Sequence, residues 1–266
     1  MRNIENASTT ALITGASSGI GEALARIFNA NGHKLVLVAR RVERLEALSL
    51  ELTRSEGDVI PIAMDLAKQK APAQLVKQLQ EKSVSIDILV NNAGVTYAGL
   101  FSEMKPSDIQ SMLQLNSVSV SMLTRLLLPG MLERRYGKIL NIASISAFQP
   151  VPSLALYAAS KSLVLSLSEA LSEELKNTGI TATALCPGLT DTAMMDNTEK
   201  FEASLPDFLI ADVNRVAQEG YDACMKGQAV HIPGVANRLG TLWSQYQPRW
   251  LLRTVSGAIA RQLMKH

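Results

Sequence analysis

Short apolar runs alternate along the chain with longer segments whose apolar residues recur at helical spacing. The runs lie at residues 11–13, 35–38, 59–63, 86–90, 138–142, 181–186 and 229–232, and the helical segments lie at 20–30, 42–52, 71–81, 106–132, 154–176 and 213–225. Strands separated by helices of this length pair in parallel, and near-continuous hydrophobicity indicates strands buried on both faces. The pattern therefore predicts an α/β fold with a doubly wound, seven-stranded parallel sheet and helices on both faces.

No repeat, linker or low-complexity tract interrupts this alternation. An α/β chain of 266 residues can bury one large core, so we expect a single domain over residues 1–266, in which 237–266 form a helical tail. Hydrophobic residues make up 47% of the chain and charged residues 19%, which favours a globular protein over a disordered one.

Charge and cysteine content narrow the class of protein further. The 26 basic and 24 acidic residues leave a net charge of +2, too small to indicate a nucleic-acid partner. Cys186 and Cys224 are the only cysteines and the three histidines are scattered, so we expect neither a disulfide framework nor a metal site. The polar segment 1–10 lacks the apolar core of a signal peptide, and we find no run of about 18 apolar residues, so we expect a cytoplasmic protein.

A glycine-rich turn follows the first predicted strand. Its sequence, TGASSGIG at residues 14–21, leads directly into the first predicted helix. Gly15, Gly19 and Gly21 permit positive φ or a close approach of the backbone, and the helix N-terminus offers unpaired amides to an anion. Close helix packing can also select glycine, but the position after the first strand favours binding of a dinucleotide pyrophosphate.

The end of the second predicted strand distinguishes between the dinucleotides. A carboxylate there would bind the 2′-hydroxyl of NAD, but this chain has Arg40 and Arg41 and no carboxylate before Glu43. Arg40 can bind a 2′-phosphate through two N–H groups or stack on adenine, and Arg41 or the hydroxyl of Ser17 can assist. Two arginines at this place can also be ordinary solvent-exposed residues at the beginning of a helix. We expect NADP(H), with NAD(H) as the less favoured cofactor.

Tyr157 and Lys161 lie one helical turn apart on the same face of the predicted helix at 154–176. A cation within a few ångströms lowers the pKa of an acid by roughly 1–3 units, so Lys161 is expected to bring the phenol from about 10 into a range useful for proton transfer. By itself, a tyrosine and a lysine at this spacing is most often an ordinary surface pair.

The glycine-rich turn and the Tyr-x-x-x-Lys pair, in this order, resemble the short-chain dehydrogenase/reductase family of one-domain Rossmann oxidoreductases over roughly residues 10–234. Further positions match: the fourth strand ends in the family's Asn-Asn-Ala-Gly at 91–94, and Ser144 precedes Tyr157 by thirteen positions. Single motifs of this kind can be capped turns, but their joint order and spacing argue against that reading.

The resemblance implies a complete set of site residues. The catalytic positions are Asn116, Ser144, Tyr157 and Lys161. The cofactor contacts are Gly15, Ser17, Ser18, Gly19, Ile20, Gly21, Arg40, Arg41, Asp65, Leu66, Asn92, Ala93, Gly94, Tyr157, Lys161, Pro187, Gly188, Thr190 and Thr192.

The resemblance also implies hydride transfer between a nicotinamide and a carbonyl or alcohol carbon. In the reductive direction, Tyr157 would donate a proton to the carbonyl oxygen and Ser144 would stabilise the charge there. Lys161 would lower the phenol pKa and bind the nicotinamide ribose, and Asn116 would hold a water that returns protons to Lys161. This intact set argues against the alternative of a regulator that binds NADP without turnover.

The region after Pro187 covers the substrate in this family. Here it carries Met194, Met195, Phe201, Leu205, Phe208 and Leu209, and an opposing apolar wall could come from Phe148, Val151 and Leu154. Such a pocket would suit a hydrophobic ketone or secondary alcohol, although the same residues could equally be core packing. The alternative substrates are 3-oxoacyl chains or steroid-like ketones, reduced at a membrane surface.

The tail combines positive charge with large apolar residues. Residues 237–266 contain five Lys/Arg and no Asp/Glu, and Pro248 splits their helical pattern in two. Such helices can lie on an anionic membrane, close over the pocket or pack on a second subunit. Aromatic stripes are more often buried, so we favour packing within the molecule or between subunits, with peripheral membrane contact as the alternative. By resemblance we expect a homodimer or homotetramer that acts on a small-molecule carbonyl or alcohol.

Overall fold

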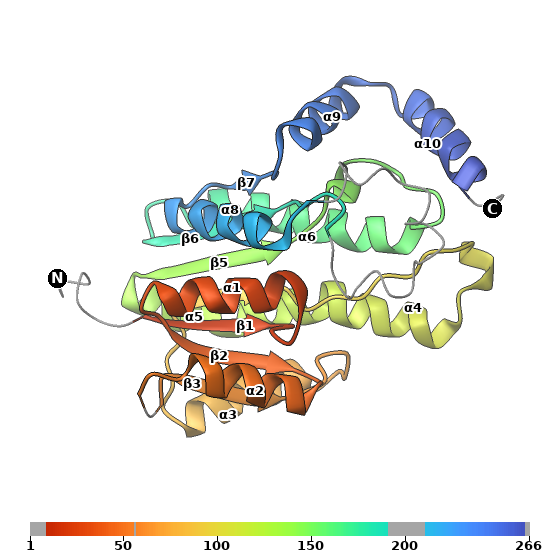
Figure 1. Cartoon of the computed structure of the whole chain (residues 1–266). Coiled ribbons are helices and arrows are strands. Elements are labelled where there is room, and N and C mark those ends of the chain that lie inside the picture. The colour runs from red at the N-terminus through yellow and green to blue at the C-terminus, as the bar shows by residue number, and fades with distance from the viewer. Residues whose placement is uncertain (1–8, 56, 191–210, 264–266) are drawn as a thin grey trace.

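The computed structural model describes residues 9–55, 57–190 and 211–263. Among them, seven parallel strands form one sheet in the order β3-β2-β1-β4-β5-β6-β7 (Figure 1). The strands are β1 (Thr10–Thr14), β2 (Lys34–Ala39), β3 (Val59–Ala63), β4 (Ile88–Asn91), β5 (Gly137–Ile142), β6 (Ile180–Leu185) and β7 (Val230–His231). The predicted doubly wound parallel sheet is confirmed. The assignment of residues 1–266 to a single domain stays a prediction.

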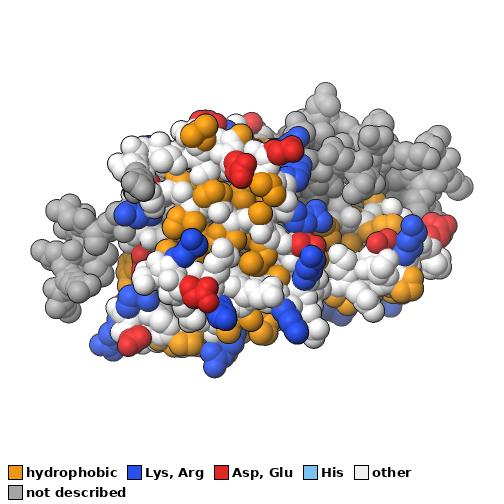
Figure 2. Space-filling view, turned by 90° about the horizontal axis from the view of Figure 1, so that it is seen from below, with side chains coloured by type: hydrophobic (Ala, Val, Ile, Leu, Met, Phe, Trp, Pro, Cys, Tyr) orange, Lys and Arg blue, Asp and Glu red, His pale blue; other side chains and the backbone are white. Residues whose placement is uncertain are grey.

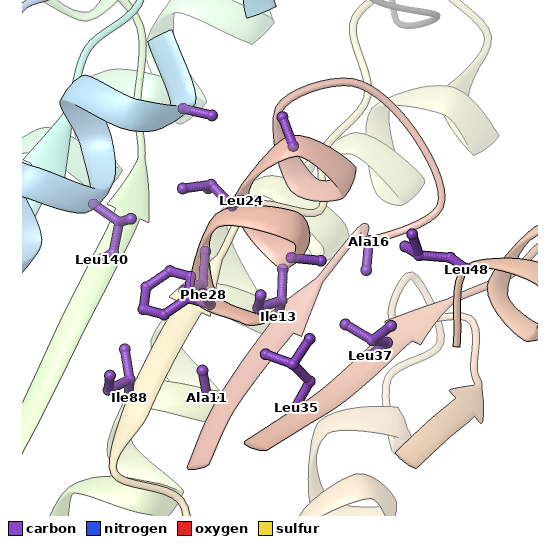
Figure 3. Packing of buried hydrophobic residues seen from close by; sticks show 14 of the residues in the cluster. Ala11, Ile13, Ala16, Leu24, Phe28, Leu35, Leu37, Leu48, Ile88 and Leu140 are labelled. Carbon is purple, nitrogen blue, oxygen red and sulfur yellow. The ribbon is translucent and has the colours of Figure 1, made fainter. Parts of the chain in front are cut away.

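Helices cover both faces of the sheet (Figure 1). One face carries α1 (Gly19–Ala30), α2 (Val42–Leu52) and α8 (Val213–Lys226), and the other carries α3 (Ala71–Glu81), α5 (Val120–Arg134) and α6 (Ala155–Glu174). Successive side chains of a strand point to opposite faces, so Ile13 joins the first cluster while Leu12 joins the second. Figure 3 shows Phe28 of α1, which is fully buried, packed over the strand residues Ile13 and Ile88. Burial on both faces explains why the strands are almost continuously apolar.

Charges of both signs are interspersed on the face shown in Figure 2, where they lie among apolar side chains. The chain as a whole has nearly equal numbers of basic and acidic residues, with a net charge of +2. On this face, neither sign of charge dominates (Figure 2).

The single helix expected over residues 106–132 is three consecutive segments. A regular helix, α4 (Pro106–Leu113), is followed by a π-helical segment, η3 (Gln114–Ser119), and then by α5. A short π-helical step has no distinctive apolar period, so the sequence pattern did not separate it. Such steps are frequent at functional sites, and this one contains Asn116.

The same stretch, Pro106–Arg134, is long and apolar enough to cross a bilayer by length and composition alone, which differs from our expectation that the chain has no such run. Its Leu123 and Met131 are buried in the apolar cluster between the sheet and its helices. A helix that packs in the core needs the same composition, so core packing accounts for these residues.

The tail forms two helices, α9 (Val235–Tyr246) and α10 (Arg249–Leu263), which separate at Pro248 as predicted. Large apolar residues of this tail are exposed to at least 50%: Val235, Leu239, Leu242, Trp243, Tyr246 and Trp250. Packing within the molecule therefore does not cover these side chains, and packing between subunits stays a prediction. The buried side of α9 carries small polar residues instead, and the helix lies next to a short 3-10 helix, η4 (Ile145–Phe148).

Candidate active site

A crevice opens at the carboxyl ends of the strands, where the order of the sheet reverses between β1 and β4. Ligands of open α/β sheets bind at such switch points. The crevice encloses a cavity of about 540 Å³. Its walls include these predicted site residues: Gly15, Ser17, Ser18, Gly19, Ile20, Arg40, Arg41, Asp65, Leu66, Asn92, Ala93, Gly94, Ser144, Tyr157, Lys161, Pro187, Gly188 and Thr190. Gly21 and Asn116 pack behind these walls, and Thr192 lies outside the described residues.

The glycine-rich turn has a backbone that requires glycine. Gly15 and Gly19 have φ angles of 68° and 57°, in the left-handed region. A Cβ on Gly15 would lie 2.8 Å from Nδ2 of Asn92, and a Cβ on Gly21 would lie 2.9 Å from the carbonyl carbon of Gly15. Any side chain at these two positions would clash, so the turn can lie this close to the neighbouring loop only with glycine.

Hydrogen bonds from Asn92 and Thr14 join the turn to the loop after β4. Nδ2 of Asn92 donates to the carbonyl oxygens of Thr14 at 2.9 Å and Gly15 at 3.2 Å. Oγ1 of Thr14 accepts from the backbone amides of Asn92 and Ala93, both at 3.0 Å. The same hydroxyl donates to the carbonyl oxygen of Val90 at 3.2 Å. The turn and the loop therefore form one continuous floor for the crevice.

The N-terminus of α1 lies at this floor. Its capping residue, Ser18, lines the crevice, and the Ser18 side chain forms no capping hydrogen bond with the first amides of the helix. Its hydroxyl instead accepts from the guanidinium of Arg41 at 2.5 Å. The first turn of α1 therefore keeps amide donors, and the positive end of its dipole, for an anion in the crevice.

Arg41 is the more constrained of the two arginines after β2. Its Nε donates to the hydroxyl of Ser17 at 3.2 Å, and a terminal nitrogen lies 3.4 Å from the Ser17 carbonyl oxygen. Arg40 also lines the crevice and is exposed. In the described parts of the chain, neither guanidinium pairs with a carboxylate. Arg40 was expected to have the leading role, whereas it is Arg41 that is hydrogen-bonded to the glycine-rich turn.

Asp65 and Leu66 follow β3 and line the crevice. Oδ1 of Asp65 accepts from the backbone amide of Ala67 at 3.1 Å. The carboxylate thus closes a local turn, which is the ordinary role for an aspartate at this position, and it does so from the crevice wall.

Ser144, Tyr157 and Lys161 meet where β5 and α6 border the crevice. The hydroxyl of Ser144 is a hydrogen-bonding partner of the Tyr157 phenol, and its Oγ also accepts from the amide of Ser146 at 3.1 Å. Lys161 is only 3% exposed. Its Nζ donates to the carbonyl oxygen of Ile142 at 2.7 Å and lies 5.7 Å from the centre of the Tyr157 ring. The tyrosine and lysine are therefore a crevice pair and not an ordinary surface pair.

Burial dominates the pKa values of this pair. It raises the pKa of Tyr157 to about 12, with the Ser144 hydrogen bond acting in the opposite direction. It lowers the pKa of Lys161 to about 8, against a small opposing effect of Cys186. The direction for the phenol is opposite to the expected one, because the cost of burying a phenolate outweighs the hydrogen bond from Ser144. Tyr157 therefore holds its proton at neutral pH, as a proton donor must.

Asn116 clamps the loop after β4 from its position in η3. Its Oδ1 accepts from the amide of Val95 at 2.9 Å, and its Nδ2 donates to the Val95 carbonyl oxygen at 2.8 Å. Nδ2 also donates to Oγ of Ser160 at 3.2 Å, so the fully buried amide is well paired. The side chain thus holds a crevice loop in place, and the water-holding role stays a prediction.

The segment after β6 contributes Pro187, Gly188 and Thr190 to the crevice. Asn237 of α9 touches this segment and was not predicted from the sequence. A Cβ on Gly188 would lie 2.6 Å from Nδ2 of Asn237, so the amide packs directly on the glycine. No motif or spacing in the sequence signals this contact, because it joins the tail to a distant loop.

The substrate wall is only partly as expected. Val151 and Leu154 line the crevice, whereas Phe148 does not and packs on a small apolar cluster that includes Ala147 and Val164. Thr96 and Gln149 also line the crevice and were not predicted. The six apolar residues expected to form a lid, Met194, Met195, Phe201, Leu205, Phe208 and Leu209, lie outside the described residues, so the choice between lid and core stays open.

Cys186 and Cys224 are both buried and free. Burial raises the pKa of each thiol to about 12, so both are inert at neutral pH. The described residues hold no group of three or more histidine, cysteine or acidic side chains that could bind a metal ion.

Comparison with known proteins identifies the class. A family model described as short chain dehydrogenase matches residues 9–203. Nodulation protein G of Rhizobium sp. (strain N33) is 35% identical over 236 residues, which cover 84% of this chain and 95% of that protein. The short-chain dehydrogenase from Sphingobium yanoikuyae in complex with NADPH has a TM-score of 0.79 at 34% identity, with 88% of this chain and 92% of that one covered.

A second solved structure is similarly close. The bulky-bulky ketone specific alcohol dehydrogenase from Comamonas testosteroni has a TM-score of 0.75 at 34% identity and covers 88% of this chain and 90% of its own. The sheet, the switch-point crevice and these likenesses define a Rossmann-type oxidoreductase. The chain belongs to the short-chain dehydrogenase/reductase family.

Proposed function

We propose that this oxidoreductase transfers a hydride between NADP(H) and a ketone or secondary alcohol, with Tyr157 as the proton donor and acceptor. One observation carries the proposal: the glycine-rich turn and the Ser144, Tyr157 and Lys161 side chains line the same cavity. A dinucleotide held on the turn and a carbonyl compound at Tyr157 would share that space, which is what direct transfer between them requires.

The residues of the crevice fit a nicotinamide dinucleotide. Gly15 and Gly21 let the backbone come close to a pyrophosphate, and the first amides of α1 can bind it. Asp65 would contact the adenine half, and Pro187, Gly188 and Thr190 would flank the nicotinamide half. When bound, the dinucleotide supplies or accepts the hydride, and the protein supplies position and charge.

Tyr157, Ser144 and Lys161 divide the proton chemistry. Burial keeps the pKa of Tyr157 at about 12, so the phenol is protonated and can donate to the oxygen of a ketone as negative charge develops there. The Ser144 hydroxyl would hydrogen-bond to the same oxygen. Lys161, with a pKa of about 8, stays mostly charged at neutral pH and would stabilise the phenolate left after donation. Its ammonium, held by the Ile142 carbonyl, would also bind the nicotinamide ribose.

Two arginines support the preference for NADP(H). Arg41 is held on Ser17 and Ser18 at the edge of the turn, and Arg40 is exposed beside it. Neither has a carboxylate partner in the part of the chain that the structure describes, so both can serve a 2′-phosphate. Similar solved structures contain NADPH in one case and NADH or NAD in others, so likeness alone leaves the choice to these residues.

A hydrophobic ketone is the substrate class we infer. Ile145, Val151 and Leu154 give the wall near Tyr157 an apolar surface, and Gln149 adds a polar group that could orient a substrate. The similar Comamonas testosteroni enzyme is specific for bulky ketones. A 3-oxoacyl or steroid-like ketone is the alternative within this class. A non-catalytic NADP sensor is disfavoured, because a sensor has no use for a proton donor that lines the crevice.

We further propose that the chain is a cytoplasmic homodimer or homotetramer. Val118 of η3, Met122 of α5 and Leu163 of α6 are 41–45% exposed, and η3 lies against α6. Apolar side chains on such adjoining elements would be covered by a second copy.

A spectrophotometric screen tests the proposed function. The purified protein is given panels of ketones and alcohols with NADPH, NADH, NADP or NAD, and the absorbance of the reduced nicotinamide is followed. We expect turnover of hydrophobic ketones with NADPH at higher kcat/KM than with NADH. Tight NADPH binding without turnover of any carbonyl or alcohol would favour the sensor instead.

A further inference from the structure

The tail helix α9 presents its apolar side outward. Along it, an exposed set at helical spacing consists of Val235, Leu239, Leu242, Trp243 and Tyr246, with exposed fractions from 50% to 82%. Trp250, at the start of α10, is 62% exposed. We call these six residues the tail stripe. A contiguous set of large apolar side chains in water marks an interaction site more often than a free surface.

The inward side of α9 is small and polar, the reverse of an ordinary surface helix. Thr241 and Ser244 are 6% and 4% exposed. Their hydroxyls donate to the carbonyl oxygens of Asn237 at 2.7 Å and Thr241 at 2.8 Å. Because these buried groups are satisfied within the helix, α9 rests on the fold without using its large apolar side chains, which stay free for another surface.

The positive charge of the tail indicates which kind of partner the tail stripe contacts. Residues 237–266 contain five Lys/Arg and no Asp/Glu. Arg238 is engaged by the fold, since its Nε donates to the Ile232 carbonyl oxygen at 3.0 Å. Arg249 and Arg253 are exposed and pair with no carboxylate in the described parts of the chain. Docking two copies through this tail would bring like charges together, whereas an anionic lipid surface complements them.

We propose that the tail stripe docks on the surface of a bilayer that contains anionic lipids. Trp243, Tyr246 and Trp250 have the ring chemistry that favours the boundary between water and acyl chains. Arg249 and Arg253, which are exposed near Trp250 at the start of α10, would bind lipid phosphates. The helix lies in the plane of the interface and does not cross the membrane.

The inward side of α9, opposite the tail stripe, borders the crevice. Asn237 of α9 packs on Gly188, and α9 neighbours η4, which begins directly after Ser144. If the proposed function holds, docking keeps the crevice within about one helix diameter, roughly 10 Å, of the bilayer, which favours ketones dissolved in lipid as the substrate class. Docking itself needs no turnover, so the two proposals can fail separately.

Intrinsic fluorescence reports on this surface directly, because Trp243 and Trp250 are the only tryptophans in the chain. The full-length protein, without cofactor or substrate, is mixed with vesicles of phosphatidylcholine alone or with phosphatidylglycerol added. With the anionic vesicles we expect co-sedimentation, a shift of the emission to shorter wavelength, and quenching by brominated acyl chains. Added salt should weaken the binding. Unchanged emission and no co-sedimentation with anionic vesicles would overturn the proposal, as would equal binding to phosphatidylcholine alone.

Matched variants test whether the vesicles bind the tail stripe and not another exposed apolar residue. Leu242→Gln should weaken co-sedimentation by about tenfold, the factor expected when one large apolar side chain is no longer buried. Leu50→Gln on α2, where Leu50 is 82% exposed, should leave it unchanged. Arg249→Glu with Arg253→Glu should abolish the preference for anionic vesicles.

The same variants identify another occupant if one exists. A large drop in melting temperature for Leu242→Gln relative to Leu50→Gln would mean that the stripe is covered by its own chain. Dissociation of a wild-type oligomer by Leu242→Gln in sedimentation velocity would mean that a second copy covers it. Either result contradicts membrane docking.

Discussion

Burial controls the protonation of the side chains beside Ser144. Lys161 is 3% exposed and has a carbonyl oxygen as its partner, so its ammonium is desolvated and its pKa falls to about 8. The same environment raises the pKa of Tyr157, because the charged form of this residue is the phenolate, which burial would desolvate. Ionisable groups with opposed shifts in one crevice are typical of sites that transfer protons. The lysine remains mostly charged and the tyrosine neutral at pH 7, which is the state that ketone reduction needs.

The buried lysine makes stability depend on pH. Its pKa is about 8 in the folded protein and 10.5 as the reference for the unfolded chain, so between these values the unfolded chain binds more protons. The stability contributed by Lys161 therefore rises with pH from about 8 to 10.5. Relative to Lys161→Met, wild-type unfolding free energy should increase by at most about 1.4 kcal/mol per pH unit. Tyr157 and both cysteines titrate similarly in the two proteins and largely cancel. Urea unfolding across this window measures the difference, and a flat or falling trend would contradict the account.

The arginines after β2 carry the cofactor preference at the residue scale. Arg41→Ala and Arg40→Ala should each weaken NADPH binding by about 1–3 kcal/mol, the value of a lost charged hydrogen bond, and should affect NADH much less. Arg44→Ala is a matched control, because Arg44 is exposed on α2 and outside the crevice. Isothermal titration with both dinucleotides gives the comparison. Equal losses for NADPH and NADH would reject the assignment of a 2′-phosphate site.

At the scale of elements, the crevice is built from loops held by neighbouring secondary structure. The turn before α1 is fixed to the loop after β4 by Asn92 and Thr14, and the same loop is fixed from η3 by Asn116. A π-helical step in the middle of a long helix changes the direction of the side chains that follow it. We infer that this step turns Asn116 towards Val95, so that η3, whose Leu115 lines the crevice, also shapes the site through a loop contact.

Close packing of the glycine-rich turn gives a prediction for this element. Gly21→Ala should lower the free energy of unfolding by about 1–3 kcal/mol and weaken dinucleotide binding, because the new methyl group overlaps Gly15 and Asn92. Gly240→Ala in α9 is the control, since a Cβ there meets nothing within 4 Å. It should be neutral or stabilising by up to about 1 kcal/mol. Denaturant unfolding and NADPH titration measure the stability and the cofactor affinity of both variants. If Gly21→Ala matched Gly240→Ala in both quantities, the turn would tolerate a side chain.

At the scale of the whole molecule, the parts that sequence reasoning predicted share a physical origin. Strands buried on both faces are apolar throughout, so β2 and β3 were located to within a residue or so. The glycine-rich turn and the Tyr157 and Lys161 pair were predictable because local geometry dictates those residue types. The contact of Asn237 with Gly188 and the outward face of α9 were not, because they depend on where distant segments meet. The direction of the Tyr157 pKa depended on burial, which spacing does not reveal.

Assembly is a further property of the whole molecule. If Val118 and Met122 face a second copy, Met122→Glu should shift sedimentation velocity from an oligomer to a smaller species, because a charge would be buried in the interface. Leu50→Glu on α2 should leave the species unchanged, since Leu50 is 82% exposed on another helix. A wild-type monomer at micromolar concentration would contradict the proposed homo-oligomer.

The most direct test of the central claim is the turnover of Tyr157→Phe with the best ketone and NADPH, measured beside NADPH binding to the same variant. The phenyl ring keeps the shape of the crevice wall and removes only the proton donor. We predict that kcat falls by at least about two orders of magnitude, the usual contribution of a general acid, while the Kd for NADPH stays within a few-fold of wild type. A variant that binds NADPH and reduces the ketone at near wild-type rate would contradict the account.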